Sequence, residues 1–448
     1  MKRSIYLLAI LFFLLQTKAH AQVWTELGGV SPVSNNGGEI TSICSDASGN
    51  IYAAGWFANA SGHHFVAKYN GSTWSELGGI NGLAADSMIL SICADPSGNI
   101  YAAGYFTNDS GSFYVAKYNG TSWSELGGLN TLKANCQIEC ICSDPSGNIY
   151  AAGCFRNDSS SYYVAKYNGS VWSELGGVNR FAPNNNIICI CSDPSGNIYA
   201  AGAFWDASGN YYVGQYNGLS WSELGGSNNL DGPIQCICSD PSGHIYIGGA
   251  VDLGIGNVAE YNGATWSQLG GQNGLDANDV ILSICADRYG NIYAGGQFYD
   301  ANSNKYVAKY NGSVWSELGG LNGLEANNDI YSLCSDASGN IYAAGGFYDQ
   351  SFYAYVARYG YPAGINEVSV GTIKFSPNPT NSSFTISSGQ SLSNAIIRVL
   401  DLTGQILMEK ENQSGTSFTL DISEQAAGLY FVEVRQAENV WTGKVVKE

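Results

Sequence analysis

Residues 89–128 read ILSICADPSGNIYAAGYFTNDSGSFYVAKYNGTSWSELGG, and close copies of this stretch fill the chain from residue 23 to residue 360. One aspartate and one tryptophan mark the pattern, and each occurs seven times, with the aspartates 47 or 49 residues apart. A period in the forties, built from short strand-forming runs, is typical of β-propeller blades. The markers are Asp46, Asp95, Asp144, Asp193, Asp240, Asp287 and Asp336, and Trp24, Trp74, Trp123, Trp172, Trp221, Trp266 and Trp315.

Each copy reads as four short strands separated by turn residues. In the quoted copy the runs ILSICA, NIYAAGYF, YVAKYN and WSEL carry residues that favour strands, and the turn sequences DPSGN and NG separate two pairs of them. Asn, Asp and Gly are the residues that tight hairpins require. The first run holds small Ser and Cys residues that suit the crowded centre of a propeller, so we expect it to be the innermost strand.

The two ends of the array complete each other. Residues 24–27 have the sequence of a fourth strand without the three that should precede it, and residues 355–359 form a third strand that no tryptophan strand follows. The N-terminal strand can therefore supply the outer strand of the last blade, which leaves no open sheet edge. We predict an all-β, seven-bladed propeller over residues 22–363, closed by its N-terminal strand and monomeric.

The order of the strands assigns the connections to two faces. The DPSGN-type and NG turns lie on one face, here called the turn face, and hardly vary among the copies. The connections after WSELGG, and those between the second and third strands, lie on the opposite face, here called the loop face, and differ in length and composition. A ligand that distinguishes the blades must be bound by the segments that differ.

The repeat resembles a known one. Residues 95–104, DPSGNIYAAG, fit the D-x-S-G-N-(I/V)-Y-x-x-G signature of secreted bacterial β-propeller repeats. The resemblance implies the fold but no particular activity, because propellers include hydrolases, lyases, lectins and scaffolds.

The N-terminus has the layout of a secretory signal peptide. Lys2 and Arg3 precede an apolar run over residues 5–15, and residues 19–21 (AHA) form a small-x-small cleavage site. The run is too short for a bilayer span of about 20 residues, and we expect cleavage of residues 1–21. Across the 448 residues the formal net charge is −18, which argues against nucleic acid and anionic membranes as partners.

Residues 364–448 carry no repeat and alternate in strand fashion, which predicts a small Ig-like β-sandwich. Four motifs occur in order: SPNPTN at 376–381, VLDLTGQ at 399–405, AGLYFV at 427–432 and GKVVK at 443–447. The module resembles the type A C-terminal sorting domain of the type IX secretion system of the Bacteroidota. The matching motif residues are Pro377, Asn378, Pro379, Asp401, Gly404, Gly428, Tyr430, Lys444 and Lys447.

That resemblance implies a partner and a location. The partner is the type IX secretion machinery, engaged through the C-terminal module, and the protein is expected to be secreted or held at the cell surface. No other segment of the sequence is long and apolar enough to span a membrane.

The positions of most cysteines are set by the repeat, and this argues against extensive disulfide pairing. Seven of the twelve occupy one repeated position on the first strand, which favours buried small residues over pairing. Cys140, Cys189 and Cys236 each precede a repeated cysteine by two residues, and C-x-C places both side chains on one strand face, so a soft-metal site is an alternative. Cys136 and Cys154 lie outside the pattern and could form a pair.

Candidate ligand contacts lie where the copies differ. Trp56 and Trp205 are not shared by all blades, and charged residues lie in or near the same variable segments. An acidic series in the second-to-third-strand loops could bind Ca²⁺ through oxygen atoms, although turn chemistry explains Asp there equally well. The candidate binding residues are Trp56, Arg156, Asp158, Arg180, Trp205 and Asp206, and the calcium candidates are Asp109, Asp158, Asp206, Asp300 and Asp349.

We therefore expect a non-enzymatic binding protein for a glycan or protein ligand, without a cofactor or with Ca²⁺. No nucleophile elbow, zinc-protease motif or P-loop is present, and no catalytic residue is assigned. The alternatives are a polysaccharide hydrolase or lyase with Glu139 at the channel mouth, and a purely structural surface protein.

Overall fold

The chain divides into two compact units, Met1–Tyr361 and Pro362–Glu448, and each is described by itself. The predicted signal peptide, residues 1–21, lies outside the described residues. Within the described ranges no helix is long and apolar enough to cross a membrane. The computed structural model describes residues 22–28, 38–128, 131–177, 181–225, 230–250, 258–360, 374–401, 406–436 and 439–448.

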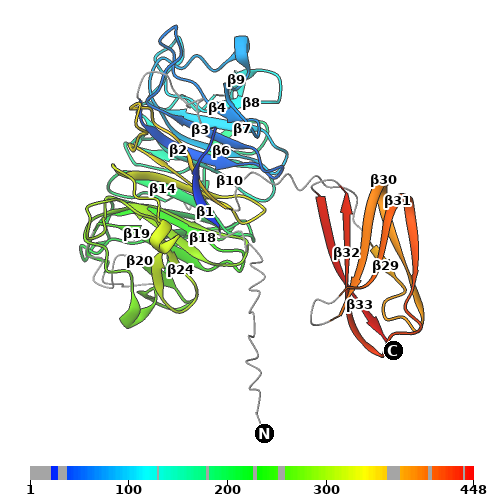
Figure 1. The fold of residues 1–448 in the computed structure, drawn as a ribbon. Helices are drawn as coiled ribbons and strands as arrows, with labels where there is room; N and C mark the ends of the chain where they lie inside the picture. Colours follow the sequence, from blue (N-terminus) through cyan, green and yellow to red (C-terminus); the bar gives the residue numbers. More distant parts are fainter. Residues whose placement is uncertain are drawn as a thin grey trace. The chain divides into compact units, whose positions relative to one another are not determined.

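Seven four-stranded antiparallel sheets form the first unit, one for each copy of the repeat (Figure 1). The first strand of each blade contacts the first strands of both neighbouring blades, so these seven strands surround the centre. Blades 1 to 3 consist of β2 (Ile40–Ser45), β3 (Ile51–Gly55), β4 (Ala67–Tyr69) and β5 (Trp74–Glu76); β6 (Ile89–Ala94), β7 (Ile100–Gly104), β8 (Ala116–Tyr118) and β9 (Trp123–Glu125); and β10 (Ile138–Ser143), β11 (Ile149–Gly153), β12 (Ala165–Tyr167) and β13 (Trp172–Glu174). Blades 4 to 6 consist of β14 (Ile187–Ser192), β15 (Ile198–Gly202), β16 (Gly214–Tyr216) and β17 (Trp221–Glu223); β18 (Ile234–Ser239), β19 (Ile245–Gly249), β20 (Val258–Tyr261) and β21 (Trp266–Gln268); and β22 (Ile281–Ala286), β23 (Ile292–Gly296), β24 (Ala308–Tyr310) and β25 (Trp315–Glu317).

The seventh blade joins the two ends of the array. Its sheet has the order β1-β28-β27-β26, so β1 (Val23–Glu26) is the outer strand beside β26 (Ile330–Ser335), β27 (Ile341–Gly345) and β28 (Ala357–Gly360). Val23 lies opposite Gly360, and Glu26 lies opposite Ala357. The predicted closure of a seven-bladed propeller by its N-terminal strand is confirmed.

A ring of hydrogen bonds links the outer strands of neighbouring blades. The indole Nε1–H of Trp123 in β9 donates to the carbonyl oxygen of Leu77, which follows β5 of the preceding blade. All seven repeated tryptophans make this bond, at 2.8–3.1 Å. Trp24 donates to Leu318, and Trp74 donates to the residue after β1, so the ring passes through the closing strand. The repeated tryptophans therefore serve contact between blades.

The turn aspartate organises each first hairpin. In blade 2, Oδ1 of Asp95 accepts the backbone N–H groups of Ser97 and Asn99, and Oδ2 accepts the Asn99 amide and the hydroxyl of Tyr101. Gly98 has φ 81°, a conformation that glycine adopts without strain. Burial alone would raise the pKa of Asp95, but these hydrogen bonds outweigh it and hold the pKa below its usual value. The same network recurs in all seven blades, with His244 replacing the asparagine in blade 5.

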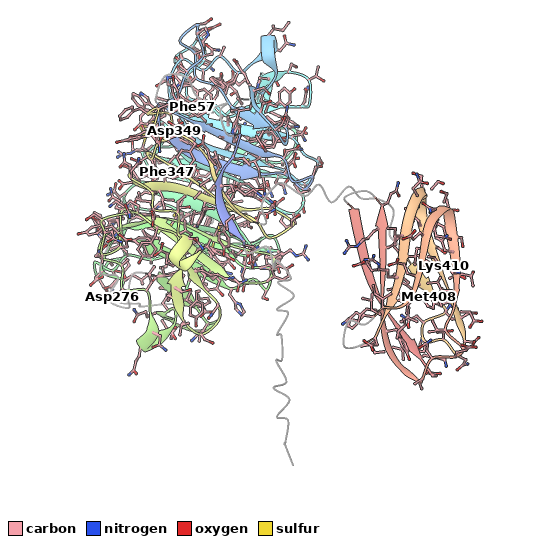
Figure 2. The ribbon with its side chains drawn as sticks, in the orientation of Figure 1. Phe57, Asp276, Phe347, Asp349, Met408 and Lys410 are labelled. Carbon is pink, nitrogen blue, oxygen red and sulfur yellow. A yellow bond between two sulfur atoms is a disulfide. The ribbon has the colours of Figure 1, made fainter. Side chains whose placement is uncertain are left out.

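Phenylalanines and small residues fill the space between blades. Phe57 and Phe347, which follow β3 and β27, are almost completely buried (Figure 2). Each packed cluster combines residues of two neighbouring sheets; one of them contains Tyr52 of blade 1 together with Phe106 and Ile89 of blade 2. The core of the first unit is therefore a set of layers between blades.

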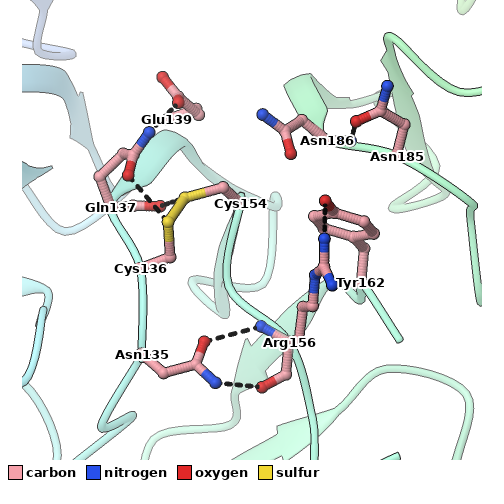
Figure 3. The surroundings of a disulfide bond; sticks show 9 residues. All are labelled: Asn135, Cys136, Gln137, Glu139, Cys154, Arg156, Tyr162, Asn185 and Asn186. Carbon is pink, nitrogen blue, oxygen red and sulfur yellow. Dashed lines mark hydrogen bonds between the residues drawn. A yellow bond between two sulfur atoms is a disulfide. The ribbon is translucent and has the colours of Figure 1, made fainter. Parts of the chain in front are cut away.

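Ten cysteines are free thiols, and two form a disulfide. The repeated cysteines lie on the first strands, where burial raises the pKa of thiols such as Cys93 and Cys334 well above the ordinary value. Cys136, in the loop before β10, is bonded to Cys154, which follows β11 (Figure 3). Both interpretations drawn from the sequence, buried thiols and this one pair, agree with the structure.

The second unit is a five-stranded β structure with its own core. The first residues of its long strand, 383–387, pair with β29 and β31, whereas residues 396–400 pair with β31 and β32. The strand can thus join both layers of the predicted sandwich. Met408 packs against the buried cluster that includes Phe384 and Val432 (Figure 2). The strands are β29 (Lys374–Ser376), β30 (Ser383–Leu400), β31 (Ile406–Asp421), β32 (Gly428–Gln436) and β33 (Asn439–Lys447).

Replacing His244 with Asn should remove a pH-dependent part of the stability. Nδ1 of His244 lies 2.9 Å from Oδ2 of Asp240, and this hydrogen bond raises the pKa of the imidazole above its ordinary 6.5. A raised folded-state pKa gives stabilisation that is complete below the unfolded-state pKa and is lost as the pH rises through the folded-state pKa. We expect the Tm of the wild type, relative to that of His244→Asn, to be highest below about pH 6.5 and to fall above it. A Tm difference that does not change with pH would contradict this expectation.

Reduction of the disulfide should destabilise the propeller. The bond joins residues 18 positions apart, and closing a loop of this length stabilises a fold by about 3 kcal/mol. We expect a reductant to lower the free energy of unfolding of the wild type by about 2–4 kcal/mol, and to leave a Cys136→Ser/Cys154→Ser variant unchanged. Denatured, unreduced protein should titrate as ten thiols, and a count of twelve would show that the bond is absent.

Candidate functional site

The connection between the second and third strands is a short hairpin on the loop face. In blade 4, Oδ1 of Asp206 accepts the backbone N–H groups of Ser208 and Asn210, at 2.7 and 2.9 Å. The two residues flanking this turn, Trp205 and Tyr211, pair as an antiparallel bridge. Five other blades repeat the turn, with Asn59, Asn108, Asn157, Asp300 and Asp349 in the capping position.

The residue before the cap is also held from the neighbouring loop. Asn184, which precedes β14, donates its amide N–H to the carbonyl oxygen of Trp205 at 3.0 Å and accepts the Trp205 backbone N–H at 3.1 Å. Three further blades have the same amide clamp, and none of these bonds uses the side chain of the clamped residue. That side chain can therefore vary while its backbone stays fixed. The other clamped pairs are Asn135 with Arg156, Asn278 with Tyr299, and Asn327 with Tyr348.

Exposed aromatic side chains gather in these hairpins. Trp205 is 42% exposed, and its ring centroid lies 6.2 Å from that of Tyr211. In blade 7 the corresponding ring, Tyr348, lies 5.3 Å from Phe352. Seven aromatic side chains are exposed among the described residues, and all except Tyr289 lie on the loop face. The six loop-face aromatics are Trp56, Tyr105, Trp205, Tyr299, Tyr348 and Phe352.

The structure places the described members of the predicted ligand contacts at four kinds of position. Trp205 and Arg156 occupy the same clamped position in blades 4 and 3. Trp56 lies two residues nearer the end of its second strand, in blade 1, and is not equivalent to Trp205. Asp206 is a turn cap, and the N–H of Asn210 is the main cause of its lowered pKa. Asp158 follows a cap, and Arg180 lies outside the described residues.

Blade 3 contains the disulfide and the predicted alternative catalytic residue, Glu139. Its disulfide lies near Gln137, whose amide donates to Oε1 of Glu139 at 3.0 Å (Figure 3). Burial raises the pKa of Glu139, and the hydrogen bond from Gln137 opposes this shift. The guanidinium of Arg156 lies 4.3 Å from the ring centroid of Tyr162 and donates to its hydroxyl. No second carboxylate contributes to this shift.

The capping residue also decides how the fourth-strand glutamate is paired. In blades 1 to 3 the cap is Asn, and its amide donates to the glutamate, as Asn108 does to Glu125 at 3.0 Å. In blades 4, 6 and 7 the cap is Asp, which cannot donate. Burial, followed by the neighbouring aspartate, raises the pKa of Glu223, Glu317 and Glu26 in these blades. Oε1 of Glu223 is buried without a hydrogen-bond partner.

The predicted calcium aspartates do not form one equivalent set. Asp206, Asp300 and Asp349 are caps, whereas Asp109 and Asp158 lie one residue later in their turns. In the described parts of the chain no group of three or more His, Cys, Asp or Glu side chains is arranged to hold a metal ion. The calcium site remains a prediction.

The C-x-C cysteines contact protein atoms between and within blades. Sγ of Cys140 accepts the backbone N–H of Ile190 in the next blade at 3.4 Å. Cys189 donates to a carbonyl oxygen of its own blade, and Cys236 donates to the carbonyl oxygen of Ile281 in the next. These contacts explain the first cysteine of each C-x-C pair as packing, and the soft-metal alternative gains no support from the described residues.

The sequence reasoning missed Tyr348, Phe352 and Glu26. A position-by-position comparison of the six capped hairpins carries the missing signal, because Phe352 replaces the Gly or Ser of the other five turns. Glu26 belongs to the predicted closing strand, and Asp349 affects its pKa because that strand returns to blade 7.

The C-terminal motifs hold the closing strand of the second unit. Asn378 donates to the carbonyl oxygen of Lys444 at 2.7 Å and accepts the N–H of Val446 at 2.9 Å. Nζ of Lys447 donates to the carbonyl oxygen of Ser423 at 2.9 Å. Tyr430 donates its hydroxyl to a nearby backbone carbonyl. Gly404 lies outside the described residues.

Comparisons with known proteins bear on both units. Residues 374–448 match the family described as secretion system C-terminal sorting domain. An extracellular domain assigned to the hybrid two-component system BT3049 of B. thetaiotaomicron is 14% identical, with a TM-score of 0.53 over 95% of this chain and 57% of that chain. An extracellular domain assigned to the one-component system BT4673 of the same organism is 11% identical, with a TM-score of 0.49 over 96% and 58%.

These likenesses to solved structures concern the fold alone. This chain spans less than two thirds of the length of either structure. No curated protein matches it. The first unit is therefore a seven-bladed β-propeller, and residues 374–448 are a type IX secretion system C-terminal sorting domain, which indicates secretion and attachment at the cell surface.

Proposed function

We propose that this exported protein binds carbohydrate on the loop face of its propeller, without catalysing a reaction. The observation that carries the proposal is the gathering of six exposed aromatic side chains on that face. Large aromatic residues dominate binding surfaces, because they bury much area and lose little conformational freedom. The turn face, with one exposed aromatic among the described residues, offers no comparable surface.

The hydrogen bonds that hold the backbone of three of these residues support the proposal. The clamps on Trp205, Tyr299 and Tyr348 fix the backbone before any ligand arrives. A fixed surface lowers the ordering cost of association. Several similar sites on one face would also let a long polymer bind with avidity.

An enzymatic role has less support. Glu139 has a raised pKa, as an acid catalyst requires, but its partner is the amide of Gln137. A polysaccharide hydrolase or lyase would show turnover that is lost in Glu139→Gln, and we expect no such turnover.

The test is binding of the full chain to a broad glycan array, with and without Ca²⁺. We expect at least one polymeric glycan to bind, and a Trp56→Ala/Trp205→Ala variant to bind it about tenfold more weakly or worse, a loss of about 1.4 kcal/mol. The matched control is Tyr289→Ala, because Tyr289 is 68% exposed on the turn face. Its binding should equal that of the wild type.

Two results would contradict the proposal. An array without hits would favour a protein ligand or a structural role. Equal losses in Tyr289→Ala and in the double variant would show that the binding is not confined to the loop face. A requirement for Ca²⁺ would support the predicted acidic-loop site.

A further inference from the structure

The seventh blade has a large cavity on the loop face, where the closing strand meets the last hairpin. Its volume is about 750 Å³. Aromatic residues and two carboxylates line it, and no Lys, Arg or His is among its lining residues. The lining residues that matter here are Glu26, Tyr348, Asp349, Phe352 and Tyr355.

Phe352 occupies a turn position whose backbone conformation favours glycine. Its φ is 64°, and its side chain is 71% exposed. A bulky residue in this left-handed region is a conformational outlier, and strain of this kind gathers at ligand sites. The equivalent residues elsewhere are Gly62, Gly111, Ser160, Gly209 and Ser303, with φ between 60° and 89°.

Phe352 and Tyr348 form an apolar platform beside the cavity. Their ring centroids are 5.3 Å apart, and their planes are inclined by 31°. Asn327 fixes the backbone of Tyr348 through bonds of 2.8 and 3.0 Å. The apolar face of a pyranose ring is a suitable partner for such a surface.

The two carboxylates of the cavity lack the donor that their counterparts have. In blade 2 the Asn108 amide donates to Glu125, whereas in blade 7 Asp349 takes the place of the asparagine. Glu26 and Asp349 line the same cavity, and burial, followed by Asp349, raises the pKa of Glu26. Burial, followed by Glu26 and Asp349, also raises the pKa of Tyr355 to about 12. A cationic donor would relieve this repulsion.

We propose that the seventh-blade cavity binds an amino sugar, with its ring on Tyr348 and Phe352 and its protonated amino group at Glu26 and Asp349. The proposal rests on the proposed carbohydrate binding and adds the ligand class and the blade. Anionic sugars are excluded, because the cavity offers two acids and no cationic side chain. An ammonium group also gains attraction from a nearby aromatic face.

The experiment measures binding of three disaccharides to the full chain by calorimetry near neutral pH: the glucosamine disaccharide, its N-acetylated form and cellobiose. Disaccharides report on a single pocket, whereas polymers report on the whole face. We expect the glucosamine disaccharide to bind at least tenfold more tightly than the other two. Equal affinities for all three would overturn the assignment of the amine.

Two variants locate the site. Phe352→Gly should lose at least tenfold in affinity while its Tm stays the same or rises, because glycine relieves the strained turn. Glu26→Gln/Asp349→Asn should abolish the preference for the amine. The matched control is Asp300→Asn/Glu317→Gln, the equivalent pair of blade 6, where Ser303 replaces the phenylalanine; its affinity should not change.

The outcomes separate this proposal from the preceding one. If polymeric glycans bind but Phe352→Gly keeps full affinity for the disaccharide, the seventh-blade site is wrong and the binding function stands. If neither polymers nor disaccharides bind, both proposals fail. A loss of affinity in the blade 6 control equal to that in blade 7 would show that the phenylalanine platform does not set the site.

Discussion

Seven indole N–H groups, each hydrogen-bonded to a backbone carbonyl of the preceding blade, make one closed circuit around the propeller. Each blade is a sheet with a buried face on both sides, and the packed layers of phenylalanine, alanine and isoleucine lie between blades. A blade is therefore stable only beside its neighbours. The circuit fixes the spacing of the outer strands, and with it the positions of the loop-face hairpins.

The division between constant and variable positions follows from this arrangement. The turn face is occupied by hydrogen bonds to seven aspartates, which leave little room for change. On the loop face the backbone of each clamped residue is held by atoms other than its own side chain. Arg156, Trp205 and Tyr348 can thus occupy equivalent positions without altering the blade. Backbone atoms of the clamped residues hold the hairpins in place, and their side chains are left for the proposed recognition of a ligand.

The repeat made most of the fold predictable. The period and the turn residues predict seven blades, because these local patterns occur seven times in the sequence. The two half-blades at the ends of the array predict the closure of the ring. The candidate site was less accessible. Trp205 could be found as a residue that the other copies lack, whereas Phe352 becomes unusual only when its φ is known. The proximity of Glu26 to Asp349 follows from the predicted closure, but its electrostatic effect depends on the burial of Glu26, which the sequence does not report.

The strand exchange in the seventh blade constrains the order in which the propeller can be synthesised and closed. Thr25 and Arg358 are neighbours in the sheet but 333 residues apart in sequence. During synthesis β1 therefore emerges long before its partner exists, and the ring stays open until β28 is complete. An unpaired strand and an unfilled sheet edge are the features that promote aggregation in folding intermediates. Closure of the ring therefore cannot precede the synthesis of β28, the last strand of the propeller.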